Sequence, residues 1–418
     1  MRKPSILIIF SLAAALLFTV SAPAQVIVLT RATVIDGSGA GAQKDVTIVM
    51  ENGRIRDMGP SSKLPVPAGA TVLDLSGKFI VPGIINAHGH VGASTVPQLR
   101  QYALYGVTTA TSMQTDPDEV VQVREAQRRG ELRGARVFTA KYRFAPDPEV
   151  VTPEQARAKV DQTVAAGADF IKVWVDGGFG TRAKLSPEFC AAVLEQARKH
   201  GKLTFGHAYE VSDAKMLVDR GLNILGHNVR DREADGDFIA LLKRRNVTLI
   251  PTLIRDEFLF AYGDAPAWID DPFFQKFVPP ERLAVRKTKI RDEQAKHPQR
   301  ALIKAGYEMN RINLKKLSDA GVRIAFGTDS GGAADRFFIQ GFSEHREMEL
   351  MVQSGLTPMQ VLQSFSKGAS EALGIDKDFG TLARGKTADL LVLEKNPLEN
   401  ISNMRTIQAI YLGGKKFE

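Results

Sequence analysis

The stretch at residues 79–90 constrains the fold most, because a short apolar run ends there in two histidines separated by one glycine. A short run rich in Ile and Val is typical of a buried strand rather than a helix. Alternate residues of a strand point to the same face, so His88 and His90 are expected to project together, with Gly89 leaving room beside them. Two imidazoles at the end of a buried strand supply half of a metal site, although two satisfied structural histidines are the alternative.

The composition is that of a soluble globular protein with a large core, since 44% of the 418 residues are hydrophobic and 24% are charged. The formal charge is +8. The basic residues are scattered among acids, which describes a solvated surface rather than a nucleic-acid stripe and mildly favours anionic small substrates. The single Cys190 excludes an internal disulfide and lies in a helical pattern, as a predicted core residue.

Residues 1–24 have the features of a secretory signal peptide. Arg2 and Lys3 form a basic start, residues 6–20 are apolar, and a small-residue cleavage site ends at Ala24. We expect cleavage after Ala24, export to the periplasm or out of the cell, and no stable membrane insertion; a signal-anchor is the alternative. Removal of Arg2 and Lys3 lowers the formal charge from +8 to +6.

The rest of the chain divides into strand-rich ends and an alternating middle. Residues 25–80 and 375–418 consist of strand-like runs and turns, and we expect them to form one composite β-sandwich domain. Two strands around a turn are predicted within 380–393, and another strand at 407–415. Residues 81–374 alternate short apolar strands with amphipathic helices, a rhythm that indicates a parallel sheet.

Eight strands are predicted in this middle part, which fits an α/β fold of the (β/α)8 TIM-barrel type. Besides the strand that ends at His88, they lie at residues 107–112, 136–140, 170–175, 203–207, 223–227, 247–252 and 322–327. An insertion at residues 255–300 carries seven aromatic residues among Asp, Pro and Lys. Long insertions of this kind are often lids over a binding site, and the alternative is a helical decoration that packs its own aromatics.

Four further residues with metal-binding or proton-transfer chemistry lie in or directly after these strands. Lys172 is in mid-strand among apolar residues, where an unpaired ammonium is costly. His207 and His227 each end a strand, and Asp329 follows the last one. Each alone has an ordinary alternative: a salt bridge, a structural histidine or a helix cap. A TIM barrel gathers the carboxyl ends of its strands at one face, so together they are expected to complete a ring of ligands.

This ring resembles that of the amidohydrolase superfamily in its binuclear, carboxylated-lysine subtype. The matching segments are His88-Gly89-His90 with its Val81-Pro82-Gly83 lead-in, Lys172, His207, His227, Asp329, Asp36-Gly37 and Gly385-Lys386-x-Ala388-Asp389-Leu390. The resemblance implies two divalent metal ions, with zinc expected because imidazole and carboxylate ligands suit it.

The resemblance also implies a role for each ligand. His88, His90 and Asp329 would bind the more buried metal. His207 and His227 would bind the second, and Lys172, converted to a carbamate by CO₂, would bridge the two. A metal-bridging hydroxide would then attack an amide carbonyl, with Asp329 acting as general base and afterwards as general acid.

Residues 168–172 and 250–253 are most similar to the prolidase-like and imidazolonepropionase-related group, which implies cleavage of dipeptides or N-acyl amino acids. The loop at residues 141–144 departs from that group, which often carries a histidine there. Lys141, Arg143 and Arg230 follow the third and sixth predicted strands and are expected at the barrel mouth. Substrate-binding candidates are these three, with Arg230 favoured, and Tyr209, and a carboxylate-bearing small molecule is the expected partner. The sequence leaves formation of a homo-oligomer open.

Two other functions remain open from the sequence. The segment from His207 to Glu210 fits the His-x-x-Glu of mononuclear deaminases of the same fold, in which the Glu moves protons. Such enzymes lack a bridging lysine, so Lys172 argues against them. The other alternative is a non-catalytic metal-binding or ligand-binding protein, which is disfavoured because no ligand position is missing.

Overall fold

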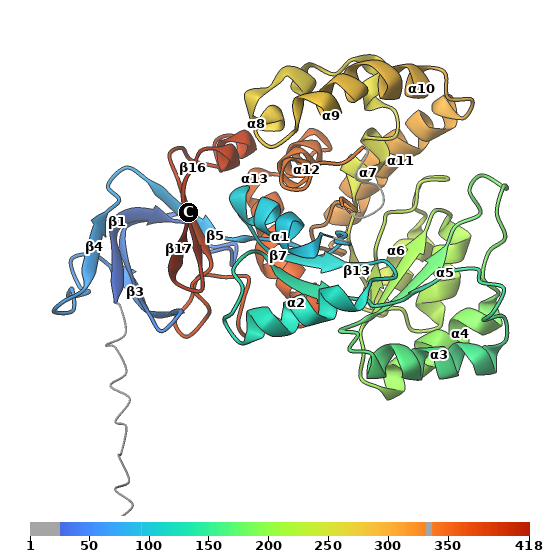
Figure 1. Ribbon diagram of the computed structural model, residues 1–418, viewed down its shortest axis with the longest axis horizontal. Helices are drawn as coiled ribbons and strands as arrows, with labels where there is room; N and C mark the ends of the chain where they lie inside the picture. Colours follow the sequence, from blue (N-terminus) through green and yellow to red (C-terminus); the bar gives the residue numbers. More distant parts are fainter. Residues whose placement is uncertain (1–25, 93, 332–336) are drawn as a thin grey trace, which may run out of the picture.

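The computed structural model describes residues 26–92, 94–331 and 337–418. The predicted signal peptide at residues 1–24 lies outside the described residues, so cleavage and export remain predictions. Figure 1 shows the strands of both chain ends at one side of the molecule and the alternating strands and helices at the other. Among the described residues, no helix is long and apolar enough to cross a membrane.

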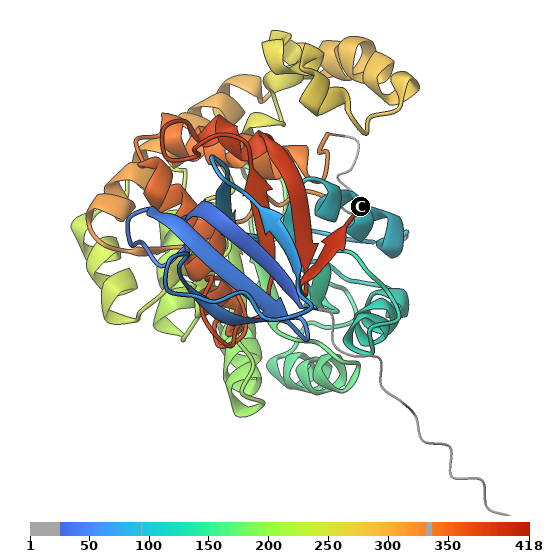
Figure 2. The same cartoon turned by 90° about the vertical axis from the view of Figure 1, so that its left-hand side faces the viewer.

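Both chain ends contribute to one eight-stranded sheet, in the order β17-β16-β15-β5-β1-β2-β3 with β4 paired to β1. Its strands are β1 (Ile27–Val34), β2 (Gln43–Glu51), β3 (Arg54–Pro60), β4 (Thr71–Asp74), β5 (Phe79–Pro82), β15 (Leu390–Leu393), β16 (Ile407–Leu412) and β17 (Lys415–Phe417). Antiparallel pairing of β5 with β15, which sets Val81 opposite Leu391, joins the two ends. Figure 2 shows these strands side by side. The shared sheet confirms that the two ends form one composite β structure, whereas a sandwich of two sheets stays a prediction.

Two strand predictions near the C-terminus are confirmed only in part. Within residues 380–393 the structure has β15 alone, because the backbone at 385–388 forms one isolated antiparallel bridge, from Thr387 to Arg54 at the start of β3, instead of a ladder. In that segment the Gly385 N–H donates to the Ile55 carbonyl at 2.8 Å, and the Ala388 N–H donates to Gly53 at 2.9 Å. The predicted strand at 407–415 is present as β16 up to Leu412. A turn at Gly413 and Gly414, both with positive φ, then connects it to β17 in a hairpin.

The stretch at residues 79–90 is not the single strand predicted from its composition. It breaks at Gly83 into β5, which belongs to the terminal sheet, and β6 (Ile84–Asn86), which belongs to the parallel strands. The hydrogen-bond partner changes here, since the Gly83 N–H donates to the Asp389 carbonyl and the Ile84 N–H to the Gly106 carbonyl, both at 3.0 Å. Only glycine fits at this position, because a Cβ at Gly83 would lie 2.2 Å from Thr108 Cγ2. The two histidines therefore follow β6 in an irregular segment, rather than ending one long strand.

Nine parallel strands form the middle of the molecule, in one six-stranded and one three-stranded sheet. Besides β6 they are β7 (Val107–Ser112), β8 (Arg136–Thr139), β9 (Arg143–Phe144), β10 (Ile171–Val175), β11 (Thr204–Ala208), β12 (Ile224–Leu225), β13 (Thr248–Leu249) and β14 (Arg323–Ile324). Backbone hydrogen bonds outside the ladders connect the two sheets, among them those from Ala87 N–H to the Phe326 carbonyl and from Asp169 N–H to the Thr139 carbonyl, both at 2.9 Å. The α/β alternation is confirmed, and closure into a TIM barrel remains a prediction.

Helices follow the strands in the predicted order. They are α1 (Thr95–Leu104), α2 (Asp118–Arg128), α3 (Pro153–Ala165), α4 (Pro187–Lys199), α5 (Val211–Asp219), α6 (Gly236–Arg244), α7 (Leu253–Glu257), α11 (Arg300–Asp319), α12 (Phe342–Gln353), α13 (Pro358–Gln363) and α14 (Ala369–Leu373). Thr152 caps α3, since its Oγ1 accepts from the Gln155 N–H at 3.2 Å. Cys190 is buried on α4 with apolar neighbours, as predicted.

The insertion is built of short helical segments. They are η1 (Ala261–Asp264), η2 (Ala267–Asp270), α8 (Pro272–Gln275), α9 (Pro280–Val285), η3 (Arg286–Ile290) and α10 (Arg291–Ala295). Figure 2 shows this insertion at the top, away from the terminal sheet. Its Trp268 ring centroid lies 5.2 Å from that of Phe258 and 5.6 Å from that of Phe342. The aromatics thus pack among themselves and against α12, and a lid role remains a prediction.

Candidate metal centre

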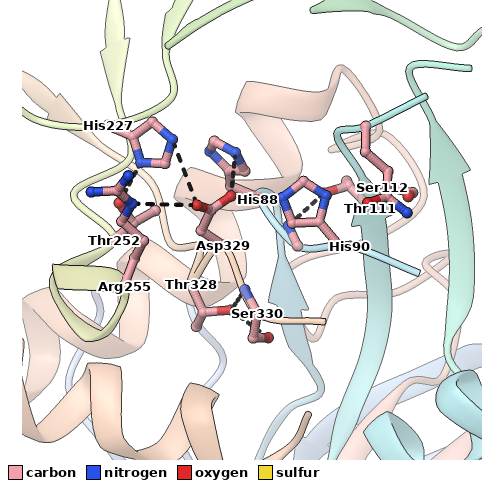
Figure 3. A network of polar contacts seen from close by, with 12 residues as sticks. His88, His90, Thr111, Ser112, His227, Thr252, Arg255, Thr328, Asp329 and Ser330 are labelled. Atoms are coloured by element: carbon pink, nitrogen blue, oxygen red, sulfur yellow. Dashed lines mark hydrogen bonds and ion pairs between the residues drawn. The ribbon is translucent and has the colours of Figure 1, made fainter. Parts of the chain in front are cut away.

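All six predicted metal ligands line one cavity of about 240 Å³ at the carboxyl ends of the parallel strands. The residues around it are His88, His90, Met113, Gln114, Arg143, Lys172, Trp174, Arg182, His207, His227, Arg255, Asp329 and Gly331. Figure 3 shows Asp329 at the centre of the polar contacts, with His88, His90 and His227 around it.

His88, His90 and Asp329 form the tightest group in this cavity. Asp329 Oδ1 lies 2.7 Å from His90 Nε2 and 3.2 Å from His88 Nε2. The ligand atoms of the three residues all lie within 4.8 Å of one another, a spacing that suits one metal ion. Although burial raises it, the imidazoles of His227, His88 and His90 hold the pKa of the Asp329 carboxyl well below its usual range. Asp329 is therefore an anionic ligand at neutral pH.

The turn that carries Asp329 is conformationally unusual. Asp329 has φ +59°, in the left-handed region that residues with a side chain other than Asn and Asp rarely adopt. Its N–H donates to the His88 carbonyl at 2.6 Å, so the backbone ties the aspartate to the histidine segment. This strain is held by the surrounding contacts, as is common at functional sites.

His207 and His227 form the second half of the cavity, with ring centroids 4.2 Å apart. Thr252 Oγ1 lies 2.7 Å from His227 Nδ1, which leaves His227 Nε2 facing Asp329 Oδ2 at 3.9 Å. Asp176 Oδ2 lies 2.9 Å from His207 Nε2, so Nδ1 is the nitrogen left to bind a metal. Such oxygen partners fix the orientation and tautomer of metal-binding histidines.

Burial sets the protonation of the buried cavity residues. It lowers the pKa of His88 to about 4 and that of His207 to about 3, so both rings are neutral, the form that binds metals. It also lowers the pKa of Lys172 to about 7. The Lys172 side chain is 2% exposed, and its Nζ lies 3.0 Å from His88 Nε2. An amine in this setting is partly uncharged at neutral pH and therefore nucleophilic.

The donor set fits divalent metal ions. Four imidazoles, one carboxylate and an amine of lowered pKa converge on one cavity. Imidazole nitrogens and carboxylate oxygens are groups that bind divalent metal ions. Three buried ring nitrogens, His88 Nδ1, His90 Nδ1 and His227 Nε2, have no hydrogen-bond partner within the described part of the chain. Of these, His227 Nε2 faces Asp329 and is available to a metal.

The four predicted substrate-binding residues do not line the same cavity. Arg143 lines the metal cavity, whereas Tyr209 and Arg230 line a second cavity of about 270 Å³ that shares Arg182 and Arg255 with the first. Lys141 lines neither cavity, because its Nζ donates to the Asp116 carbonyl at 2.8 Å and to Asp118 Oδ1 at 2.7 Å.

Glu210, the residue needed for the deaminase alternative, lies outside the metal cavity. Its carboxylate bonds to Lys184 Nζ at 2.8 Å, and its side chain is 41% exposed. The residue precedes α5 and faces the surface rather than the ligand ring. The motif that suggested it is present in the sequence, but the fold does not bring its carboxylate to the site.

Several site residues were not predicted from the sequence. Asp176 and Thr252 orient the second pair of histidines, and Arg255 Nε lies 3.7 Å from Asp329 Oδ2. Arg182 and Trp174 complete the cavity wall. Asp176 directly follows one predicted strand and Thr252 is the last residue of another, and this position was the one available signal. Their histidine partners are 31 and 25 residues away, beyond any local pattern.

Behind the ligand ring, a buried glutamate of α12 holds the turn that carries Asp329. Glu344 Oε1 accepts from Thr328 Oγ1 at 2.7 Å, from Ser330 Oγ at 2.8 Å and from Asn86 Nδ2 at 2.7 Å. Its Oε2 accepts from the Gly341 N–H at 2.6 Å. One carboxylate thus joins both neighbours of Asp329 to the end of β6.

We expect the Glu344→Gln variant to bind metal about 10- to 100-fold more weakly, as is typical when a residue that orients metal ligands is lost. Four donors face this carboxylate, and an amide cannot accept from all of them. Elemental analysis during chelator titration measures the effect. The matched control is Glu347→Gln, equally buried on α12, which accepts from the Leu253 and Ile254 N–H groups instead. If both variants lost metal affinity equally, the loss would come from disturbed packing of α12 and not from the contacts of Glu344 with the turn.

The comparisons with known proteins agree with this geometry. The Amidohydrolase family matches residues 79–416. The ochratoxinase of Aspergillus niger is 23% identical over 279 residues, which cover 63% of this chain and 49% of the relative, so the match spans about half of that protein. The imidazolonepropionase of Sphingopyxis alaskensis is 22% identical over 422 residues, covering 87% of this chain and 89% of the relative.

Solved structures show the same fold. A protein assigned as a prolidase from Bifidobacterium longum superposes with a TM-score of 0.77 and 26% identity, covering 94% of both chains. A Xaa-Pro dipeptidase with methionine bound in its active site superposes with a TM-score of 0.77 and 22% identity, covering 94% of this chain and all of the other.

Proposed function

Because the chain belongs to the amidohydrolase family, we propose that it hydrolyses the amide bond of a dipeptide or an N-acyl amino acid with the help of two divalent metal ions. The observation that carries the proposal is the convergence of four histidines, Lys172 and Asp329 on one cavity. The prolidase-like and dipeptidase-like structural neighbours agree with an amide substrate.

In this proposal His88, His90 and Asp329 would hold one ion, and His207 and His227 would hold the other. Lys172, converted to a carbamate by CO₂, would be a ligand of both. Zinc is the expected metal, because imidazole and carboxylate ligands suit it. When bound, the two ions supply Lewis acidity, which lowers the pKa of water and polarises the scissile carbonyl.

The remaining steps belong to residues of this chain. Asp329, anionic and central in the cavity, accepts the proton of the attacking water and passes it to the leaving amine. Asp176 and Thr252 keep His207 and His227 in fixed orientations. We further propose that the protein is exported through its signal peptide and acts in the periplasm or outside the cell. The deaminase alternative is disfavoured, because Glu210 is paired with Lys184 away from the ring.

The experiment that tests this function is a substrate screen with zinc-loaded protein. Dipeptides, N-acyl amino acids, lactones and cyclic ureides are offered, with free amine and ammonia measured separately. We expect release of free amino acid from dipeptides or N-acyl amino acids, and loss of activity after chelation that zinc restores. Release of ammonia from cyclic substrates without any amide hydrolysis would favour the deaminase.

The buried Arg230 is the proposed binder of the substrate carboxylate. Its side chain is 2% exposed, its Nη1 donates to the Asn228 carbonyl at 2.9 Å, and its Nε lies 3.4 Å from Asp256 Oδ1. Its Nη2 has no hydrogen-bond partner among the described residues. Arg230 lines the second cavity, where its guanidinium carbon lies 4.9 Å from the centre of the Tyr209 ring, and we propose that this guanidinium contacts the substrate carboxylate there.

We expect Arg230→Met to raise KM for an N-acyl amino acid roughly 10- to 100-fold, the usual effect of losing a hydrogen bond to a charged group. Asp256 keeps a partner in the variant, because Arg255 Nη1 lies 2.8 Å from its Oδ1. Steady-state kinetics on an acid substrate and its carboxamide analogue measure the effect. Equal turnover of the acid and the carboxamide by the wild type would contradict the proposed role.

A further inference from the structure

The second cavity has a surface that the proposed function leaves unexplained. Its two carboxylates are already engaged. Asp176 binds His207 Nε2 at 2.9 Å and accepts from the Gly178 N–H at 2.7 Å, while Asp256 binds Arg255 at 2.8 Å. The rest of its lining combines the cationic Arg182, Arg230 and Arg255 with the polar Thr181, His297 and Gln299 and with several apolar side chains.

These apolar side chains come from four separate parts of the chain. They are Phe179, Tyr209, Leu259 and Ile303. Each of the four keeps part of its surface accessible. Gly306 on α11 lacks a side chain, and a Cβ there would lie 2.9 Å from the Tyr209 hydroxyl. The Tyr209 ring therefore packs directly against α11 at Gly306, and both residues line the cavity.

Phe179 is the least expected of these residues. It has φ +57° between two glycines, Gly178 and Gly180, that also have positive φ. A phenylalanine in the left-handed region is strained, and its ring is 42% exposed, so burial in the protein does not offset the strain. The ring meets that of Tyr209 edge to face, with centroids 5.2 Å apart. The loop thus presents an aromatic surface to the cavity.

We propose that the second cavity binds the amino-acid half of the substrate and selects a large apolar side chain there, such as that of phenylalanine or leucine. The inference rests on the proposed amide hydrolysis. Arg230 binds the α-carboxylate, and Phe179, Tyr209, Leu259 and Ile303 contact the side chain. The shared wall formed by Arg182 and Arg255 then places the scissile amide on the side of the metal cavity.

A series of N-acetyl amino acids tests this selectivity with zinc-loaded full-length protein. We expect kcat/KM to fall roughly tenfold or more from N-acetylphenylalanine and N-acetylleucine to N-acetylalanine and N-acetylglycine, as in other apolar pockets. N-acetylaspartate should be the poorest substrate. A flat series, or a preference for glycine or aspartate, would overturn the proposal while leaving amide hydrolysis intact.

Variants assign the selectivity to this cavity. Ile303→Ala should reduce the preference for phenylalanine over glycine about tenfold. The matched control is Leu302→Ala on the same helix, because Leu302 is 53% exposed and does not line the cavity. Phe179→Ala, in a surface loop, gives a second test that does not depend on helix packing. Unchanged selectivity in both Ile303→Ala and Phe179→Ala would refute the assignment.

Binding of free amino acids separates this inference from the proposed function. Isothermal titration calorimetry of the wild type should show L-phenylalanine binding at least tenfold more tightly than glycine, with the difference reduced by Ile303→Ala. If these differences are found in a protein that hydrolyses no amide, the cavity assignment stands and the proposed reaction fails. If phenylalanine and glycine bind alike, the cavity assignment fails whatever the enzyme hydrolyses.

Discussion

The Lys172→Ala variant is expected to lose one of two metal ions and about 1,000-fold or more in hydrolysis rate, because several kcal/mol of transition-state stabilisation depend on the second ion. Three features of Lys172 support this. It is almost fully buried, its pKa is lowered to about 7, and its Nζ lies 3.0 Å from His88 Nε2. An ammonium there would repel two dications.

The proposed carbamate would resolve this conflict of charge. The neutral amine would attack CO₂ to form a C–N bond, and loss of a proton to solvent would leave an anionic carboxylate at the end of the side chain. Wild-type protein should therefore approach two zinc ions per chain in bicarbonate by elemental analysis, and Lys172→Ala should hold at most one. A short-chain carboxylate such as propionate should restore part of the activity of Lys172→Ala by occupying the vacated position.

Two further variants make this result specific. Lys172→Arg should not be rescued by bicarbonate, since a guanidinium forms no carbamate. Lys215→Ala, which removes a surface lysine paired with Asp235, should retain wild-type metal content and rate. One tightly held ion in the wild type, together with an active Lys172→Ala variant, would reject the binuclear centre.

The Asp329→Asn variant should lose about 100- to 10,000-fold in kcat, the usual effect of removing a general base. The change is isosteric, and asparagine tolerates the left-handed backbone at φ +59°, so the turn should persist. The amide cannot accept the proton of water, and it is a weaker partner for the ion held with His88 and His90. Pre-steady-state and steady-state kinetics, with metal content measured in parallel, separate these two effects.

Glu210→Gln is the matched control for this variant. It makes the same carboxylate-to-amide change after β11 of the same sheet, outside the metal cavity, where Glu210 pairs with Lys184. We expect its kcat to stay near that of the wild type. An inactive Glu210→Gln protein alongside an active Asp329→Asn protein would reverse the assignment and support a deaminase.

The sequence alone named the six residues, predicted as metal ligands, that the structure brings together around one cavity. Each of them lies in or directly after a short apolar run, and the carboxyl ends of parallel strands meet at one edge of a sheet. A buried strand of this kind can be predicted locally, because its apolar composition and the spacing of its apolar residues are visible in the sequence itself. The α/β alternation and the sharing of one sheet by the two chain ends followed from the same kind of local pattern.

The division of residues 79–90 between two sheets depended on contacts across the fold. Gly83 lies against Thr108, and no property of the run itself shows that a side chain cannot fit there. The same holds for Lys141, which the sequence places at the barrel mouth but the structure pairs with Asp118. A cation near a strand end is free to bind a substrate only if no acid lies closer.

The supports of the site and the second cavity were decided by tertiary structure. Glu344 reaches Asn86 across 258 positions of sequence, and Asp176 reaches His207 across 31. The wall of the second cavity combines Phe179, Tyr209 and Ile303, from three different segments. The periodicity of apolar residues indicates which face of a strand or helix is buried. Residues on one face recur every two positions in a strand and every three or four in a helix, so this pattern is local. Which distant side chains then meet depends on how the elements pack, and only the assembled fold determines that.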